Sequence, residues 1–117
     1  TIIAGSRSIT DPNLLTQAIA RCGWEVTTVL SGGAVGADQL GEDYAFKHKL
    51  KLERYPAEWK VWGRVAGLLR NSSMVEHAEA LIALWDGSSS GTQDVIRKAR
   101  IAGLRIYVQK GTRCQNV

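Results

Sequence analysis

Short apolar runs alternate with amphipathic segments along this chain. Five runs have the length of a strand and are apolar or β-branched: residues 2–4, 25–31, 50–55, 80–85 and 104–108. The run 50–55 is the weakest of these and ends at Pro56. The run 80–85 has no polar position, which is typical of a strand that is buried on both faces. The pattern therefore predicts five strands.

Apolar residues between these runs recur at spacings of three and four, which predicts helices. The helices are expected to follow Thr10-Asp11-Pro12, Gly36, Gly67 and Thr92. The second is predicted to run to about residue 49. On the third, one face is predicted to carry Leu68, Ser72, Val75 and Ala78. Thr92 is expected to cap the last helix and Gly103 to end it, while residues 57–66 are predicted to be a loop with a turn of helix.

Strands that alternate with helices predict an α/β fold with a mostly parallel sheet and helices on both faces. With 117 residues, of which 44% are hydrophobic and 22% charged, the chain is expected to form one domain over residues 1–117. The chain starts at Thr1, directly before the first strand. This leaves open whether further residues of that strand, or only an initiating Met, precede it.

The remaining composition excludes few functions. The net charge is +4, which suits an anionic ligand, but the basic residues are scattered, as on a solvated surface. A nucleic-acid face is the less favoured interpretation.

Cys22 and Cys114 have no metal-site spacing, so we expect two thiols in a reducing cytosol, with a lone disulfide as the alternative. No apolar run approaches the roughly 20 residues of a membrane helix, and no signal peptide pattern is present. We expect a cytoplasmic protein with no membrane partner.

Three loops are rich in glycine and hydroxyl residues: residues 5–8, 31–36 and 86–92. Each is predicted to lie between a strand and a helix N-terminus, where free N–H groups and the helix dipole favour an anion. Single loops of this kind are often only tight turns. Three of them at the carboxyl edge of one sheet favour a phosphate site.

Two known phosphate motifs are excluded. A P-loop needs Lys-Ser or Lys-Thr after its last glycine, whereas Gly36 is followed by Ala37-Asp38. The dinucleotide fingerprint GxGxxG is missing from the sequence, and no acidic residue ends the second strand. A nicotinamide or flavin dehydrogenase is therefore not expected.

Four stretches in order along the chain resemble the SLOG superfamily of Rossmann-like proteins, which joins the DprA/Smf proteins to the LOG phosphoribohydrolases. They are AGSR at residues 4–7, SGGAVGAD at 31–38, EWKVWGRVAGLLRNSSM at 58–74 and WDGSSSGTQDVI at 85–96. Within this group the chain is most similar to the YspA-type (YpsA-related) SLOG family. The block at 58–74 is the most specific, because glycine-rich loops recur in many folds.

The resemblance implies a five-stranded Rossmann-like domain that binds a nucleotide or nucleotide-derived phosphate ligand. Gly32, Gly33 and Gly36 would approach a phosphate, Gly91 and Thr92 would offer a second anion site, and Arg7 and Arg70 would supply guanidinium groups. The predicted ligand residues are Gly5, Ser6, Arg7, Ser31, Gly32, Gly33, Ala34, Gly36, Ala37, Asp38, Trp59, Arg70, Asn71, Asp86, Gly87, Ser90, Gly91 and Thr92.

Several of these residues have an alternative structural role. Arg70 could pair with Glu76 or another carboxylate on a helix surface, Asn71 could tie down a neighbouring loop, and Asp38 could cap its own helix. Trp59 could stack on a base or cover the core. For Trp62 we favour a place over the core, and Met74 is expected to be a core residue.

The resemblance leaves catalysis open. LOG enzymes carry PGGxGTxxE, and the position of the glutamate falls on Val95 here; Asp94, one residue earlier, points about 100° away on a helix. Asp94, Asp86 and Asp38 remain as candidates for a catalytic carboxylate. We expect a nucleotide-binding sensor, carrier or processing protein, with a LOG-type nucleotide N-glycosidase and DprA-like single-stranded DNA binding as alternatives. No metal site or required cofactor is predicted, a role for Mg²⁺ is open, and the relatives imply a homodimer.

Overall fold

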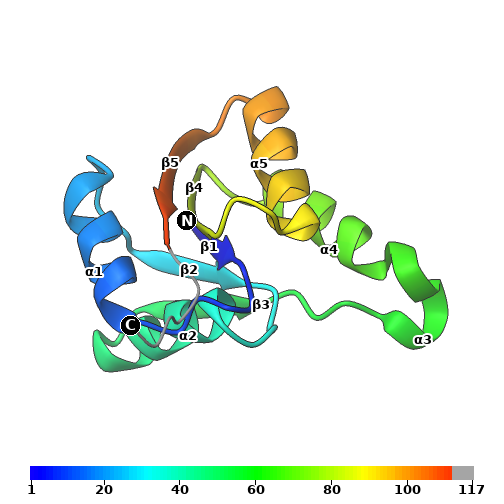
Figure 1. The fold of residues 1–117 in the computed structure, drawn as a ribbon, viewed down its shortest axis with the longest axis horizontal. Coiled ribbons are helices and arrows are strands. Elements are labelled where there is room, and N and C mark those ends of the chain that lie inside the picture. The colour runs from blue at the N-terminus through cyan, green and yellow to red at the C-terminus, as the bar shows by residue number, and fades with distance from the viewer. Residues whose placement is uncertain (112–117) are drawn as a thin grey trace.

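Five parallel strands form one sheet in the order β3-β2-β1-β4-β5 in the computed structural model, which describes residues 1–111 (Figure 1). The strands are β1 (Ile2–Gly5), β2 (Thr28–Ser31), β3 (Lys51–Arg54), β4 (Ala80–Trp85) and β5 (Arg105–Lys110). The helices are α1 (Pro12–Arg21), α2 (Ala37–Lys47), α3 (Trp59–Trp62), α4 (Ala66–Glu76) and α5 (Ser90–Ala102), with a 3₁₀ turn η1 (Gly63–Val65). The predicted α/β class is confirmed.

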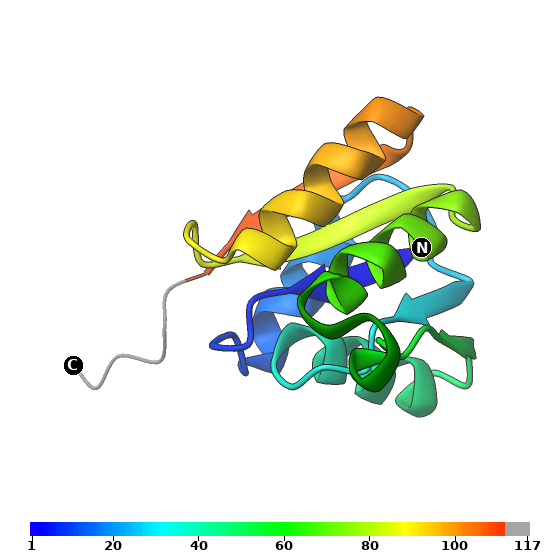
Figure 2. The same ribbon diagram turned by 90° about the vertical axis from the view of Figure 1, so that its right-hand side faces the viewer.

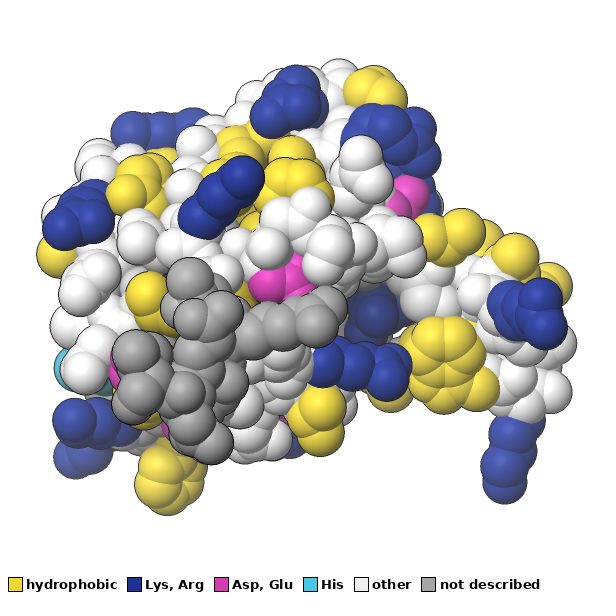
Figure 3. Space-filling view, viewed as in Figure 1, with side chains coloured by type: hydrophobic (Ala, Val, Ile, Leu, Met, Phe, Trp, Pro, Cys, Tyr) yellow, Lys and Arg dark blue, Asp and Glu magenta, His cyan; other side chains and the backbone are white. Residues whose placement is uncertain are grey.

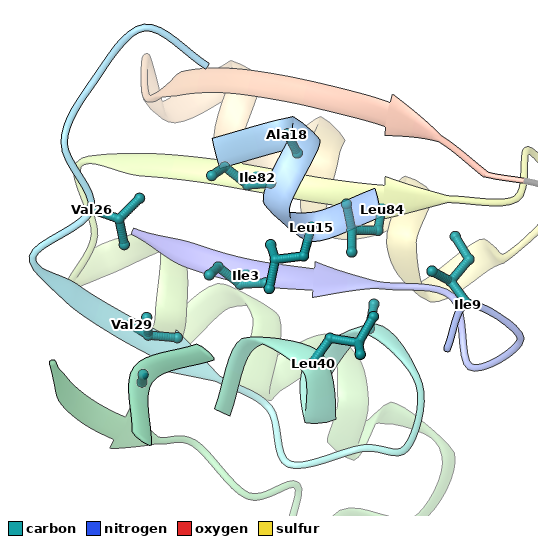
Figure 4. Close-up of a cluster of buried hydrophobic side chains, with 11 residues drawn as sticks. Ile3, Ile9, Leu15, Ala18, Val26, Val29, Leu40, Ile82 and Leu84 are labelled. Atoms are coloured by element: carbon teal, nitrogen blue, oxygen red, sulfur yellow. The ribbon is translucent and has the colours of Figure 1, made fainter. Parts of the chain in front are cut away.

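Two hydrophobic layers hold the helices to the sheet. Ile3, Ile82 and Leu84 point to the face that α1 and α2 cover (Figure 4). The alternate positions of the same strands face α4 and α5, which lie together on the opposite side (Figure 2). Successive side chains of a strand point to opposite faces, so a central strand that is covered on both sides must be apolar throughout. This explains the uninterrupted run of β4, whose residues Ala80 to Leu84 are all buried.

The neighbouring strands β1 and β4 send the chain to opposite faces of the sheet. After β1 the chain continues to α1 on one face, and after β4 it continues to α5 on the other. The two strands end side by side, because Gly5 pairs with Leu84. This divergence opens a crevice at the carboxyl ends of β1 and β4, where open α/β sheets bind their ligands.

The structure corrects three local predictions. The second strand covers only Thr28–Ser31 instead of 25–31, because β2 pairs over four residues with β3, which is equally short. The last helix is capped by Ser89 and not by Thr92: the Ser89 hydroxyl accepts from the Thr92 N–H.

The third correction concerns the segment from α3 to the start of α4, which projects from the body of the protein (Figure 1). Trp62 does not cover the core but is half-exposed, and so is Leu68, which was predicted to share one helix face with Val75. The buried residues of α4 are Ala66, Asn71, Met74 and Val75. The core position of Met74 is confirmed.

One of the two cysteines lies in the described part of the chain. Cys22 is a free, partly buried thiol, while Cys114 lies outside the described residues. Within residues 1–111, no helix has the length and apolarity needed to cross a bilayer.

Candidate functional site

A cleft of about 460 Å³ lies at the carboxyl ends of β1 and β4, bounded by the start of α5, by α4 and by the projecting segment. Figure 3 shows the recess between the body and the projection, with Lys and Arg side chains gathered beside it. The cleft brings together many of the residues predicted to bind a ligand: Gly5, Arg7, Ala34, Asp38, Trp59, Arg70, Asn71, Ser90, Gly91 and Thr92. Residues from all three predicted loops therefore meet at one site.

Other predicted ligand residues hold the loops together. Ser6 is buried, and its hydroxyl accepts from the Asp86 N–H at 3.0 Å. Ser31 is also buried; its hydroxyl donates to the Glu42 carboxylate at 2.8 Å and accepts from the Gly33 N–H at 3.1 Å. Because buried polar groups need partners, these two hydroxyls serve the protein's own backbone and side chains.

Gly36 and Ala37 also pack inward. Gly36 has φ +79°, and a Cβ at this position would lie 2.6 Å from the Arg7 Cα. Ala37 is fully buried, and its N–H donates to the Ser6 carbonyl. These contacts fix the second loop against the first.

Arg70 crosses from α4 to the loop after β2. Its Nη1 donates to the Gly32 carbonyl at 2.7 Å, and its Nε donates to the Asn71 Oδ1 at 3.0 Å. The alternative pairing with Glu76 is therefore wrong. A Cβ on Gly32 would lie 2.7 Å from the Arg70 Cζ, so the glycine makes room for this guanidinium. Burial lowers the pKa of Arg70; the Asp38 carboxylate opposes this shift and the nearby charge of Arg7 adds to it.

Asp38 is a buried carboxyl group at the edge of the cleft. It lies in the first turn of α2 with 5% of its surface exposed, and its Oδ2 accepts from the Ala34 N–H at 3.1 Å. It thus closes the loop before its helix, whose N-cap is Gly36, and does not cap that helix itself. Burial raises the pKa of Asp38 to about 6, against the opposing effects of the Ala34 hydrogen bond and the Arg70 charge.

Asn71 ties α4 to the start of α5. Its Nδ2 donates to the Gly91 carbonyl at 3.2 Å and to the Asp94 Oδ2 at 3.1 Å. Asp94 also forms ion pairs with Lys98 at 3.0 Å and with Arg97 at 3.1 Å. Partial burial works against ionisation, but the hydrogen bonds from Lys98 and Asn71 prevail and lower the pKa of Asp94.

Asp86 closes the turn after β4. Its carboxylate accepts from the N–H groups of Ser88 and Ser89 at 2.9 and 3.0 Å and from the Ser8 hydroxyl at 3.0 Å. These hydrogen bonds, led by those of the two backbone N–H groups, hold the pKa of Asp86 far below its ordinary value. Neither Asp86 nor Gly87 lines the cleft. Of the three candidate carboxylates, Asp38 is the one that does.

Arg64 is a cation of the site that was not predicted from the sequence. Arg64, on η1, lines the cleft together with Arg7 and Arg70. The signal was present, since Arg64 belongs to the same block of residues 58–74 that carries the resemblance. However, helical periodicity could not place it, because residues 59–65 form a short helix and a 3₁₀ turn with no buried residue. Within residues 1–111, the Arg7 and Arg64 guanidinium groups form no ion pair.

The start of α5 adds hydrogen-bond donors to the cleft. Ser90 and Gly91 open this helix of 13 residues and line the cleft. The first N–H groups of a helix lack partners within it. Among the described residues, no group of three or more His, Cys, Asp or Glu side chains could hold a metal ion.

Comparison with known proteins gives two matches. Residues 1–62 match the model of a family described as "YspA, cpYpsA-related SLOG family". The Gene 61 protein of Mycobacterium phage D29 is 32% identical over 115 residues, which cover 90% of this chain and 91% of that protein. No solved structure matches the chain significantly.

Proposed function

The chain belongs to the YspA, cpYpsA-related SLOG family, and we propose on this premise that it binds a nucleotide or nucleotide-derived phosphate ligand in the cleft at the ends of β1 and β4. Family membership suggests a nucleotide-related function. The cleft lies where open α/β sheets bind their ligands. The side chains that line the cleft favour, among such ligands, an anion that carries a ring.

The observation that carries the proposal is the convergence of three guanidinium groups. Arg7, Arg64 and Arg70 line the cleft, and among residues 1–111 Asp38 is the one carboxylate that lines it. Arginine binds phosphate through two parallel N–H groups, which fixes the orientation of the phosphate as well as its position. The donors at the start of α5 favour acceptor groups on the same ligand.

Trp59 supplies a flat surface for a base. It is 52% exposed although it lines the cleft, and its Cη2 lies 3.3 Å from the position of a Cβ on Gly67. A larger residue at position 67 would displace the ring from this position. A half-exposed indole beside guanidinium groups suits the stacking of a nucleobase next to its phosphate. With such a site the protein would act as a sensor or carrier of the nucleotide.

Binding is tested by isothermal titration calorimetry with purine and pyrimidine nucleoside mono- and diphosphates. We expect Arg7→Gln and Arg64→Gln each to weaken binding by about 10- to 100-fold, the effect of losing a charge-assisted hydrogen bond of about 1.5–3 kcal/mol. Arg100→Gln is the matched control, because Arg100 is an exposed arginine of α5 that does not line the cleft. Wild-type affinity in both cleft variants, or no binding of any nucleotide, would overturn the proposal.

Asp38 favours a second candidate function, cleavage of the bond between base and ribose phosphate. A carboxyl group with a pKa of about 6 in the cleft could give a proton to a departing base near neutral pH. Release of free base from a nucleoside monophosphate that is lost in Asp38→Asn and retained in Asp43→Asn would support this function. Binding of the nucleotide without turnover would leave the protein a binder.

A further inference from the structure

The segment that projects from the body of the protein leaves apolar side chains uncovered. Figure 3 shows hydrophobic side chains gathered on it. About half or more of the surface of four of them is exposed: Val61, Trp62, Val65 and Leu69. Below the segment lies a hollow of about 320 Å³, whose apolar lining residues are Tyr55, Pro56, Trp62, Ala66 and Leu69. Exposed apolar patches of this kind mark surfaces that bind a partner.

Phe46, near the end of α2, is a second uncovered apolar feature. It is 88% exposed, the largest exposed fraction of any large hydrophobic side chain within residues 1–111. Together with Leu50 and Leu52 it lines a groove of about 280 Å³ between α2 and β3. The fold leaves this phenyl ring in water. A partner that covers the ring removes its apolar surface from water, which favours association.

The hollow and the groove are neighbours on the surface and carry opposite charge. Arg54, at the end of β3, lines both, and its Nε lies 3.1 Å from the carboxylate of Glu42 in the groove. The charged residues of the hollow are Arg54, Arg70 and Glu58, and those of the groove are Glu42, Asp43 and Arg54. The hollow therefore has an excess of positive charge, and the groove beside it has an excess of negative charge.

We infer from this arrangement that two copies of the chain associate about a two-fold axis beside Arg54, and that each copy places Phe46 in the hollow of the other. A two-fold axis between two neighbouring features exchanges them, so the hollow of each copy faces the groove of its partner. The hollow has room for the ring, since cavities of about 150 Å³ already accept benzene. Asp43 approaches the positively charged hollow together with Phe46, three residues later in the same helix.

The same contact supports the projecting segment. α3 has four residues, and neither α3 nor η1 has a buried residue, so the core of the protein's own chain does not fix them. The segment nevertheless brings Trp59 and Arg64 to the cleft. A phenyl ring from the partner, packed against Trp62 and Leu69, covers the segment from the side of the hollow. Aromatic side chains that meet in this way are typical of the centre of an interface.

The test is sedimentation equilibrium of the full chain at concentrations from about 1 µM to about 1 mM. We expect the wild type to form a dimer, and Phe46→Ser to raise the dissociation constant of this dimer by at least about 100-fold, because each dimer loses two contacts worth about 10-fold each. Ile101→Ser is the matched control: Ile101 is also strongly exposed, but it lies on α5 and lines neither the hollow nor the groove. It should leave the dissociation constant unchanged.

A second variant tests the hollow itself. Ser73 lines the hollow from α4, so Ser73→Trp fills the space that receives the ring and should also give monomers. Urea unfolding checks that each variant is folded, and Phe46→Ser decides alone if Ser73→Trp is not. A wild type that stays monomeric throughout, or a dimer that survives in Phe46→Ser, would overturn the inference.

Two further outcomes would also overturn it: an equal loss of the dimer in Ile101→Ser, and a series of higher oligomers in place of a closed dimer. The proposed binding of a nucleotide does not depend on any of these results.

Discussion

The substitution Asp38→Asn tests the electrostatics of the cleft most directly. The Asp38 carboxyl is buried at the edge of the cleft, where its Oδ2 accepts from the Ala34 N–H. Asparagine has nearly the same shape and keeps an oxygen for this hydrogen bond, but it cannot ionise. The comparison therefore isolates the cost of holding a negative charge at this position.

The magnitude follows from the pKa of Asp38, which is about 6 in the folded protein against 3.8 for an unperturbed aspartate. Between these values the unfolded chain has released the proton and the folded protein still holds it. The folded state then binds more protons, so the free energy of unfolding falls as the pH rises. At about 1.4 kcal/mol for each pKa unit, the loss reaches about 3 kcal/mol above the folded pKa. The pKa values of Asp86 and Asp94 are lowered, so these carboxylates bind their protons below this pH range.

Urea unfolding followed by tryptophan fluorescence measures this difference at several pH values between about 4 and 8. We expect the free energy of unfolding of Asp38→Asn, relative to the wild type, to rise by about 3 kcal/mol from the acid to the neutral end. Asp43→Asn, which replaces an exposed carboxylate of the same helix, is the matched control variant. A difference for Asp38→Asn that stays constant within about 0.5 kcal/mol would refute the reasoning.

Two further substitutions test residues that hold the loops. Gly36→Ala should lower the free energy of unfolding in urea by about 2 kcal/mol or more, because Gly36 has φ +79° and a Cβ would press on the Arg7 backbone. Gly91 has open space around it, so Gly91→Ala should change this free energy by less than about 1 kcal/mol. Equal losses at both positions would contradict this prediction. Ser6→Ala removes the acceptor of the partly buried Asp86 N–H and should lower the free energy of unfolding by about 1–3 kcal/mol. An unchanged unfolding midpoint in urea would show that the two loops are held by other contacts.

Much of the fold could be predicted from local sequence. The apolar run of β4 identified a strand covered on both faces, and Gly103, with φ +78°, ends α5 as expected. Such signals act over a few residues, so they do not depend on the rest of the chain. Boundaries were less certain, because β2 begins at Thr28, where its pairing with β3 begins, and not at the start of its β-branched residues.

The candidate site could be predicted only in outline. Three glycine-rich loops at the same edge of the sheet indicated a ligand site, and the structure joins them in one cleft. Which loop residues face that cleft was not predictable, because Ser6 and Asp86 are partners across 80 positions of the chain. Arg64 enters the site only because the segment between β3 and α4 folds back beside it.

The sequence by itself determined the α/β architecture, the end of the sheet that matters and the residue types available there. It did so because hydrophobic periodicity and strand-to-helix glycines are local properties. The tertiary structure alone decided how those residues are used: Ser31 and Asp86 serve the loops, Arg70 is anchored to Gly32, and Asp38 lies buried beside it. A polar side chain is free for a ligand only after the buried N–H and carbonyl groups around it have found partners, and those partners come from distant parts of the chain.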